Sequence, residues 1–578
     1  MNKRETNTHK DTMLYLKVYS SRLMRIINTI SVIIASFMIL VGCTFNFEFD
    51  DNNNELSREN LAIENIVDKG PVNGGSLNMF STIPDTLNPL LTDNLHVQKF
   101  SMLIFESLVK IDASQRPVPY LAKSWEATNN ALEWVFNLNE NVFWHDGRKF
   151  TAEDVAFTLD TLKSSHVNSI YKQNVINIKS YEILDEYTIK LTLFTSDSFT
   201  SEAMTFPILS KNHYGGIGDI KSAGNITPIG TGPYKFDSYT EDTIILLKAN
   251  ENWWNSENVN GLASTPHIAN IGIKIYADEE DIYEAFESRN IDFFTVNHDQ
   301  SYKFAGRTDI NIKKFTGRNF EFISFNLFNP LLSDVNIRKA ISLALDKFEI
   351  MNEVLVNKII LSDIPIIPGT LFNDGMTLEY SNTEKAALLL DEEGWKISSS
   401  GKRYKNINGT TQYLNLKLIV NKGNVDRIMV AEKIKAQLSK IGINIEIEEL
   451  NWADYMKNLN DKKFDIAFMG IRVNSRSDLS SLYSSKNRYS QNKSAYNVSG
   501  YTNESVDYYL NKILSENDIS QKKASLINMK QIIADEVPYI GLYFYYDALI
   551  YHKKLKGVSY IHVWDPLMDI PKWYIPNY

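Results

Sequence analysis

The chain has 578 residues, of which 43% are hydrophobic, 22% charged and 12% aromatic. This length exceeds one hydrophobic core and predicts two or three domains. The net charge of −10 argues against nucleic-acid binding, because neutralising phosphates needs a basic surface. A single cysteine excludes an intrachain disulfide, a CxxC redox pair and a cysteine-based metal site.

The first 43 residues have the pattern of an export signal. Residues 1–25 carry six basic and two acidic side chains, and a largely apolar run follows at 26–41. This order is typical of a signal peptide. The ending Leu40-Val41-Gly42-Cys43 resembles the bacterial lipobox, in which the cysteine is acylated and becomes the new N-terminus. We therefore expect 1–42 to be a lipoprotein signal peptide and Cys43 to be the lipidated residue, rather than part of a signal anchor.

Residues 43–74 predict a flexible tether. The segment is rich in Asn, Asp and Glu and includes Asp50-Asp51-Asn52-Asn53-Asn54. A tether of this kind spans on the order of 30 Å. No later stretch approaches the ~20 apolar residues of a membrane-spanning helix. The expected location is thus the outer face of a cell membrane, held by two or more acyl chains on Cys43.

From residue 75 onward, strand and helix patterns alternate. Short alternating runs predict strands at 76–81, 133–138 and 187–194. Apolar residues at helical spacing predict a helix over 96–109, and Thr151 with acidic residues after it predicts a helix N-terminus running through Leu162.

The second half of the chain has the same mixed character. A strand at 414–420, a helix at 426–441 and a strand at 443–447 form a β-α-β order, which predicts a partly parallel sheet. Further helices are predicted at 278–287, 337–345, 505–514 and 520–536, and an aromatic strand at 539–546. The predicted fold class is α/β.

Several motifs occur in a fixed order along this body. They are Pro84-Asp85-Thr86-Leu87-Asn88-Pro89, Ile104-Phe105-Glu106-Ser107-Leu108-Val109, Pro119-Tyr120-Leu121-Ala122-Lys123-Ser124-Trp125-Glu126, Trp144-His145-Asp146-Gly147, Phe150-Thr151-Ala152-Glu153-Asp154-Val155, Gly230-Thr231-Gly232-Pro233-Tyr234, Asn252-Trp253-Trp254, Asn336-Ile337-Arg338-Lys339-Ala340 and Phe464-Asp465-Ile466-Ala467. The series resembles the family 5 extracellular solute-binding proteins, the oligopeptide, dipeptide and nickel receptors of ABC importers. The resemblance covers about residues 75–578.

The resemblance implies a two-lobed periplasmic-binding-protein-like fold of type II, cluster C, with an extra subdomain inserted in the first lobe. Lobe I is expected to comprise 75–105, 227–321 and 549–578. The inserted subdomain is expected at 106–226 and lobe II at 322–548. A ligand that contacts both lobes shifts the hinge equilibrium toward closure.

No motif predicts catalysis. His145 and Asp146 are neighbours, but neighbours in a strand point to opposite faces, and Asp-Gly is a common turn pair. Gly230-Thr231-Gly232-Pro233 lacks the P-loop lysine, so it is interpreted as a backbone device. The nine histidines show no HExxH spacing. We expect a binding protein without enzymatic activity, cofactor or metal site made of protein ligands.

The resemblance also implies a ligand pocket in lobe II. Peptide-binding members use a Trp and a later Trp-x-x-Asp segment, whose Asp pairs with the free amine of the peptide. The first Trp matches Trp452. The later segment falls on residues 471–474, where Ile471 replaces the Trp and Asn474 replaces the Asp. Since an amide cannot neutralise an ammonium, Asp478 is a candidate substitute, and Arg472 is a candidate partner for a carboxylate.

Backbone recognition is a second route to peptide binding, because strand-like hydrogen bonds ignore side-chain identity. By resemblance, such contacts are expected from the loop 84–88, which includes Asp85, and from 324–326, which includes Asn326. Short oligosaccharides and nickel chelates remain alternative ligands.

Three functions compete on this scaffold. The first is a monomeric receptor that delivers peptides or peptide-like solutes to an ABC permease. The second is a surface peptide sensor or adhesin. The third, an extracellular hydrolase, requires a nucleophile–His–acid or paired-carboxylate constellation, and none stands out in the sequence.

Overall fold

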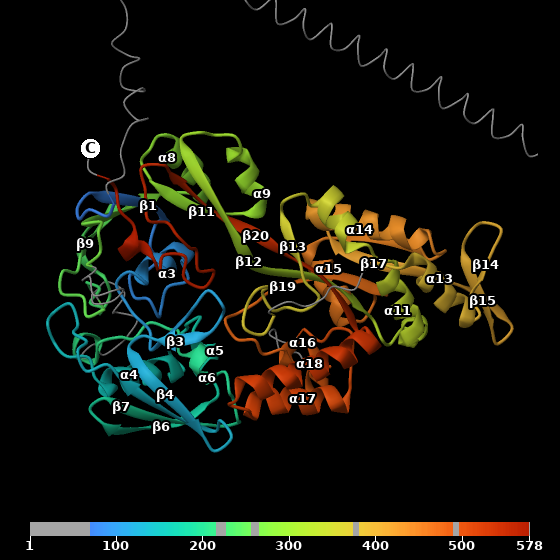
Figure 1. The fold of residues 1–578 in the computed structure, drawn as a ribbon, viewed down its shortest axis with the longest axis horizontal. Helices are drawn as coiled ribbons and strands as arrows, with labels where there is room; N and C mark the ends of the chain where they lie inside the picture. The colour runs from blue at the N-terminus through green and yellow to red at the C-terminus, as the bar shows by residue number, and fades with distance from the viewer. Residues whose placement is uncertain (1–69, 216–226, 256–264, 374–380, 489–495, 577–578) are drawn as a thin grey trace, which may run out of the picture. The chain divides into compact units, whose positions relative to one another are not determined.

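The computed structural model describes residues 70–215, 227–255, 265–373, 381–488 and 496–576. The predicted signal peptide, Cys43 and the tether lie outside these residues. The described residues belong to one compact unit, Asp68–Tyr578, shown in Figure 1. It is mixed α/β, as predicted.

The largest sheet has seven strands, in the order β11-β20-β12-β19-β17-β18 with β13 (Ile359–Leu361) paired to β20. Two long antiparallel strands, β12 (Ile310–Phe325) and β20 (Tyr539–His552), form its centre. The end of β20 pairs with β11 (Phe293–Asn297), and the end of β12 pairs with β19 (Ile466–Arg472). The two long strands thus connect β11 at one end with β19, β17 and β18 at the other (Figure 1).

The predicted β-α-β unit is confirmed. Strand β17 (Asn415–Asn421) and strand β18 (Asn444–Leu450) are parallel, and α14 (Val425–Ser439) connects them. The helix begins where the Asn424 side chain accepts a hydrogen bond from the backbone N–H of Arg427, a common way to satisfy the first turn. Its inner face is apolar and fully buried, formed by Val430, Ala431, Ile434 and Leu438.

Two other sheets come from the first half of the chain. The sheet β1-β10-β9-β8 is formed by Ser76–Thr82, Asn270–Tyr276, Ile244–Ala249 and Tyr234–Thr240. The antiparallel sheet β4-β5-β7-β6 is formed by Ala122–Thr128, Glu133–Leu138, Thr188–Leu193 and Ile178–Asp185. The three strands predicted in this half are therefore present. Helix α4 (Ala152–Lys163) begins after Thr151, as predicted, with the Thr151 backbone N–H donating to Asp154 Oδ2 at 3.0 Å.

The remaining helix predictions in the second half hold. They correspond to α8 (Ile282–Glu287), α11 (Val335–Ala344), α17 (Glu504–Ser515) and α18 (Ile519–Glu536). The structure adds elements that were not predicted: α13 (Thr383–Glu392), α15 (Trp452–Asn460) and a small sheet of β14 (Lys396–Ile397), β15 (Arg403–Ile407) and β16 (Thr410–Tyr413). The expected helix at 278–287 is divided into a 3-10 turn, Glu279–Asp281, and α8.

The helix predicted over 96–109 is wrong in its second half. Helix α3 covers only Leu95–Ser101, because the next backbone groups bond to a distant segment. The N–H of Gly232 donates to Ile104 O at 2.9 Å, and that of Tyr234 donates to Leu103 O at 3.0 Å. A Cβ on Gly230 would lie 1.8 Å from Ile104 O. The two glycines are thus a backbone device, as the sequence indicated.

Two of the sequence motifs meet in the interior. Glu106 is 2% exposed, and its carboxylate accepts hydrogen bonds from the indole N–H groups of Trp253 at 3.0 Å and Trp254 at 2.7 Å. Burial raises the pKa of Glu106, and the bond from Trp254 opposes this. These motif residues therefore serve the packing of the fold.

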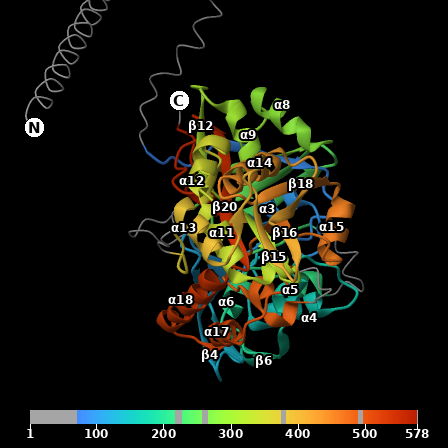
Figure 2. The ribbon, with the colours of Figure 1, turned by 90° about the vertical axis from the view of Figure 1, so that its right-hand side faces the viewer.

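Residues 106–215 pack against the second half of the chain. Phe199 is 1% exposed and belongs to a core cluster with Phe372 and Met529. Next to it, the Ser198 N–H donates to Leu514 O at 2.7 Å. Figures 1 and 2 both show α6 (Thr200–Ala203) beside α17.

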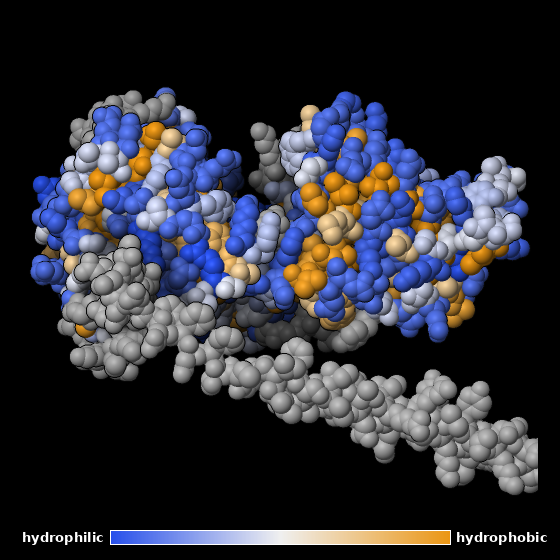
Figure 3. Space-filling model, turned by 90° about the horizontal axis from the view of Figure 1, so that it is seen from above, coloured by the Kyte–Doolittle hydropathy of each residue, from blue (hydrophilic) through white to orange (hydrophobic). Residues whose placement is uncertain are grey.

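In Figure 3, hydrophilic side chains cover most of the described surface that is visible, and apolar residues gather in separate patches. Among the described residues, no helix has both the length and the apolar content that crossing a membrane requires.

Candidate ligand-binding site

One side of strand β19 is open along its last residues. β19 pairs with β12 over its whole length, from Ile466 to Arg472, but with β17 only at Ile466 and Ala467. The Val473 N–H donates to Arg318 O on β12 at 2.9 Å. Because the backbone groups of successive residues point to opposite sides of a strand, those of Gly470 and Arg472 point away from β12. No other described strand pairs with them there.

Two aromatic side chains of α15 border this open side. The Tyr455 hydroxyl donates to Phe468 O, on the open side of β19, at 2.6 Å, and Tyr455 is buried. Trp452 stacks on Tyr455 with ring centroids 5.7 Å apart and is 63% exposed. The tyrosine holds the helix against the strand, and Trp452 extends an exposed apolar surface beside the open edge.

The loop after β19 places Asn474 and Asp478. Asn474 Oδ1 accepts a hydrogen bond from the Arg476 N–H at 2.9 Å, and Asp478 Oδ1 accepts one from the Ser480 N–H at 2.9 Å. Arg476 Nη2 lies 3.9 Å from Asp478 Oδ2 and 2.7 Å from Asp197 Oδ2. The Asp478 carboxylate therefore already has a cation beside it.

Arg476 and Asp197 were not predicted from the sequence. Asp197 is 5% exposed; burial raises its pKa, and the Arg476 guanidinium opposes this. In the same loop, Ser475 O accepts a hydrogen bond from Gln115 Nε2 at 2.9 Å. These contacts join positions about 280 to 360 residues apart, so no local pattern signals them. They fix the loop against residues 106–215.

Asp85 lies in a different pocket. Its Oδ1 accepts from Thr92 Oγ1 at 2.5 Å, and its Oδ2 accepts from the Asp93 N–H at 2.8 Å. The pocket beside it has a volume of about 520 Å³ and is lined by the loop 83–87 and by residues of and after β8, among them Phe236 and Tyr239. The Asp85 carboxylate thus stabilises its own loop at the wall of this pocket.

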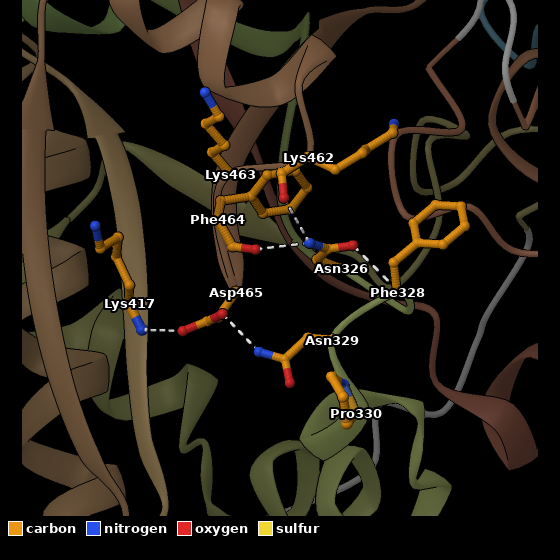
Figure 4. A pocket seen from close by; sticks show the side chains of 9 residues that line it. All are labelled: Asn326, Phe328, Asn329, Pro330, Lys417, Lys462, Lys463, Phe464 and Asp465. Carbon is orange, nitrogen blue, oxygen red and sulfur yellow. Dashed lines mark hydrogen bonds between the residues drawn. The ribbon is translucent and has the colours of Figure 1, made fainter.

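Asn326 lies at the other end of β19 from Arg472. It lines the pocket drawn in Figure 4, whose volume is about 480 Å³. Its Nδ2 donates to Lys462 O at 3.0 Å and to Phe464 O at 2.8 Å, and nearby Asp465 Oδ2 accepts from the Lys417 N–H at 2.7 Å. The seven residues of β19 separate the two ends by roughly 20 Å. The structure therefore gathers Trp452, Arg472, Asn474 and Asp478 along one strand and its loop, and places Asp85 and Asn326 in two separate pockets.

The described residues contain no group of three or more His, Cys, Asp or Glu side chains able to hold a metal ion. The turn at Trp144-His145-Asp146-Gly147 is structural: the Gly147 N–H donates to Trp144 O at 2.8 Å, and the Gly147 φ of +86° lies in the left-handed region that favours glycine. His145 packs against the glycine segment, with Nε2 3.0 Å from Gly232 O.

The fold is that of two-lobed solute-binding proteins. The solved structure of HbpA2 from Haemophilus parasuis matches 87% of this chain and 100% of its own, with 22% identity and a TM-score of 0.74. That of AppA from Bacillus subtilis in complex with a nonapeptide matches 88% of this chain and 100% of its own, with 25% identity and a TM-score of 0.59.

The sequence comparisons agree. A family model described as "Bacterial extracellular solute-binding proteins, family 5 Middle" matches residues 116–493, and the chain belongs to this family. The oligopeptide-binding protein AppA of Bacillus subtilis (strain 168) is 27% identical over 87% of this chain and 92% of its own length. The dipeptide-binding protein of Escherichia coli (strain K12) is 25% identical over 67% of this chain and 74% of its own. These relatives are named as binding proteins.

Proposed function

We propose that this protein captures peptides or peptide-like solutes outside the cell and delivers them to the permease of an ABC importer. The observation that carries the proposal is the open side of β19 at Gly470 and Arg472, where an extended ligand can add as a further strand. Trp452, which stacks on the buried Tyr455, supplies an apolar wall beside it. The relatives named for oligopeptides and dipeptides support the same ligand class.

In this proposal the ligand backbone, rather than a free amine, is the main recognition element. Asn474 stands where peptide-binding members carry the amine-binding Asp, and its Oδ1 already accepts the Arg476 N–H. Asp478 is the remaining carboxylate of the loop, and its Oδ2 lies 3.9 Å from Arg476 Nη2. A ligand ammonium placed here would meet a cation as well as an anion. Strong selection for a free N-terminus is therefore not expected.

The proposal includes the domain division expected from the sequence, with lobe I at 75–105, 227–321 and 549–578, the inserted subdomain at 106–226 and lobe II at 322–548. β12 and β20, which pair with each other from Ile310 to Ser324, would form the connection between the lobes. We also propose that Cys43 carries the lipid anchor and that residues 43–74 let the body reach a membrane permease as a monomer.

The deciding experiment is mass spectrometry of small molecules released from the full-length protein after purification in detergent. Recovery of peptides supports the proposal. Recovery of only oligosaccharides or metal chelates overturns the ligand class. Uptake of the recovered peptides should also fail in a deletion strain; unchanged uptake together with a changed signalling response would favour the sensor or adhesin alternative.

A further inference from the structure

Four charged side chains lie close enough to act on one another electrostatically near the irregular part of the β12–β20 pair. They are Lys99 in the last turn of α3, Arg318 on β12, Arg472 at the end of β19 and Asp547 on β20, and we call this set the cationic corner. Three residues of β12, 317–319, face only Tyr545 of β20, because the register shifts between Thr316 and Phe320. The irregular ladder places Arg318 beside β19, where its Nε donates to Val473 O at 2.9 Å.

The other members lie around this point. Arg472 pairs in register with Asn319, next to Arg318. Asp547 Oδ2 lies 2.7 Å from where a Cβ on Gly317 would be, so a residue without a side chain is required there. Lys99 Nζ donates to Thr295 Oγ1 on β11 at 3.2 Å, and β11 pairs with the stretch of β20 that contains Asp547.

The charges of the corner act on one another. Burial lowers the pKa of Lys99; Glu279 and Asp547 oppose this, and Arg472 adds to it. Burial likewise lowers the pKa of Arg318 to about 10, with a further contribution from Arg472 and opposition from Asp547. Three cations thus face Asp547, and Glu279 near Lys99 is a second carboxylate. This still leaves an excess of positive charge in a protein whose net charge is −10.

Arg472 is the member best placed to receive a ligand. Its side chain is exposed, its backbone faces the open side of β19, and its guanidinium has no hydrogen bond or ion pair with any residue that the structure describes. The Arg318 guanidinium, in contrast, lies 4.9 Å from the ring centre of Trp564, which fixes its plane. A planar guanidinium binds a carboxylate through two parallel hydrogen bonds.

We propose that the cationic corner binds a carboxylate of the ligand, with Arg472 as the direct contact and Lys99 and Arg318 supplying the surrounding positive field. The inference rests on the proposed peptide function and specifies its substrate class: extended solutes with an anionic group at the Arg472 end of β19. Asn474 cannot pair with a ligand ammonium as an Asp would. In this proposal, binding of a ligand carboxylate by Arg472 supplies binding energy in its place.

The test is capture of random hexapeptide libraries by the immobilised full-length protein, refolded to remove bound solute, with mass spectrometry of the captured peptides. One library has free C-terminal carboxylates. A second is amidated, and a third is amidated and lacks aspartate and glutamate. We expect efficient capture of the first and about 10- to 100-fold less of the third, because hydrogen bonds to charged groups contribute roughly 1.5–3 kcal/mol. Enrichment of acidic residues from the second library would assign the carboxylate to a ligand side chain, and its absence would assign it to the C-terminus.

Variants identify the residue. Arg472→Gln should remove the preference for the first library, Arg472→Lys should restore part of it, and Lys99→Gln should weaken it. Lys402→Gln, at an exposed position between β14 and β15, is the matched control. If all three libraries are captured equally and Arg472→Gln changes nothing, the carboxylate site is wrong although peptide binding stands. If no library is captured, the peptide function itself is wrong.

Discussion

The buried ion pair between Glu321 and Arg427 offers a quantitative test of how the candidate site is supported. Arg427 Nε lies 2.7 Å from Glu321 Oε2, and its Nη2 lies 3.0 Å from Oε1. The two side chains are 11% and 6% exposed. A Cβ on Gly470 would lie 2.2 Å from Arg427 Nη2, so the pair lies directly against the open strand.

Glu321→Gln should lower the free energy of unfolding by about 3–5 kcal/mol, because it leaves a buried guanidinium without its counter-charge. The double variant Glu321→Leu/Arg427→Met removes both charges and should lose much less stability, since a well-packed apolar pair can replace a buried ion pair. The measurement is urea denaturation of ligand-free protein followed by tryptophan fluorescence. Asp461→Asn, which removes an exposed ion pair with Lys457, should leave the midpoint unchanged.

A loss below about 1 kcal/mol for Glu321→Gln would refute this reasoning, since it would mean that water reaches the guanidinium. A double variant that is as unstable as the single one would also contradict it, because the unpaired charge would then not be the cause. Peptide capture by the double variant tests a second point: whether the ion pair supports ligand binding at Gly470 independently of its effect on stability.

Three other predictions follow from single sites. Burial lowers the pKa of His145 to about 4, so the unfolded state takes up a proton first as pH falls. The contribution of this group to the free energy of unfolding is therefore fully present above pH 6.5 and is lost between pH 6.5 and 4. It amounts to about 3 kcal/mol. His145→Asn should flatten stability over that range, and an unaltered pH profile would contradict the assignment. Phe199→Ala should lower the free energy of unfolding by about 3–5 kcal/mol, because the ring centre lies 6.0 Å from that of Phe372 inside a core cluster. A thermal unfolding midpoint equal to that of the unmodified protein would contradict this prediction. Cys43→Ala should move the protein from the membrane fraction to the soluble one, whereas unchanged fractionation would exclude the lipid anchor.

Local patterns predicted part of the regular structure, but not the long strand β12 or the helices α13 and α15. The strand–helix–strand unit at β17, α14 and β18 and the start of α4 after Thr151 depend on side chains a few residues apart, so periodicity and capping suffice. The helix expected over 96–109 stops at Ser101 because its later carbonyls bond to Gly232 and Tyr234. β20 extends beyond the predicted strand because β11 and β12 both continue to pair with it.

The candidate site likewise contains some residues that the sequence predicted and others that it did not. Trp452, Arg472 and Asn474 were chosen by motif spacing, since they lie within a short stretch of the sequence. The charges around them were not located. Lys99 and Arg318 come from a helix and a strand more than 200 residues apart, and Asp197 reaches Arg476 across 279 residues. Contacts of this kind join segments far apart in the chain, which no short window of sequence encodes.

The sequence by itself determined the family and the α/β class, because each depends on residue identity and order. Only the tertiary structure decided that β19 keeps an open side and that three cations and the Asp547 carboxylate lie close enough to interact near it. The physical reason is that a free strand edge and the electrostatic interaction of several charges depend on which segments lie next to one another in space. Residues far apart in the sequence become neighbours only when the chain folds.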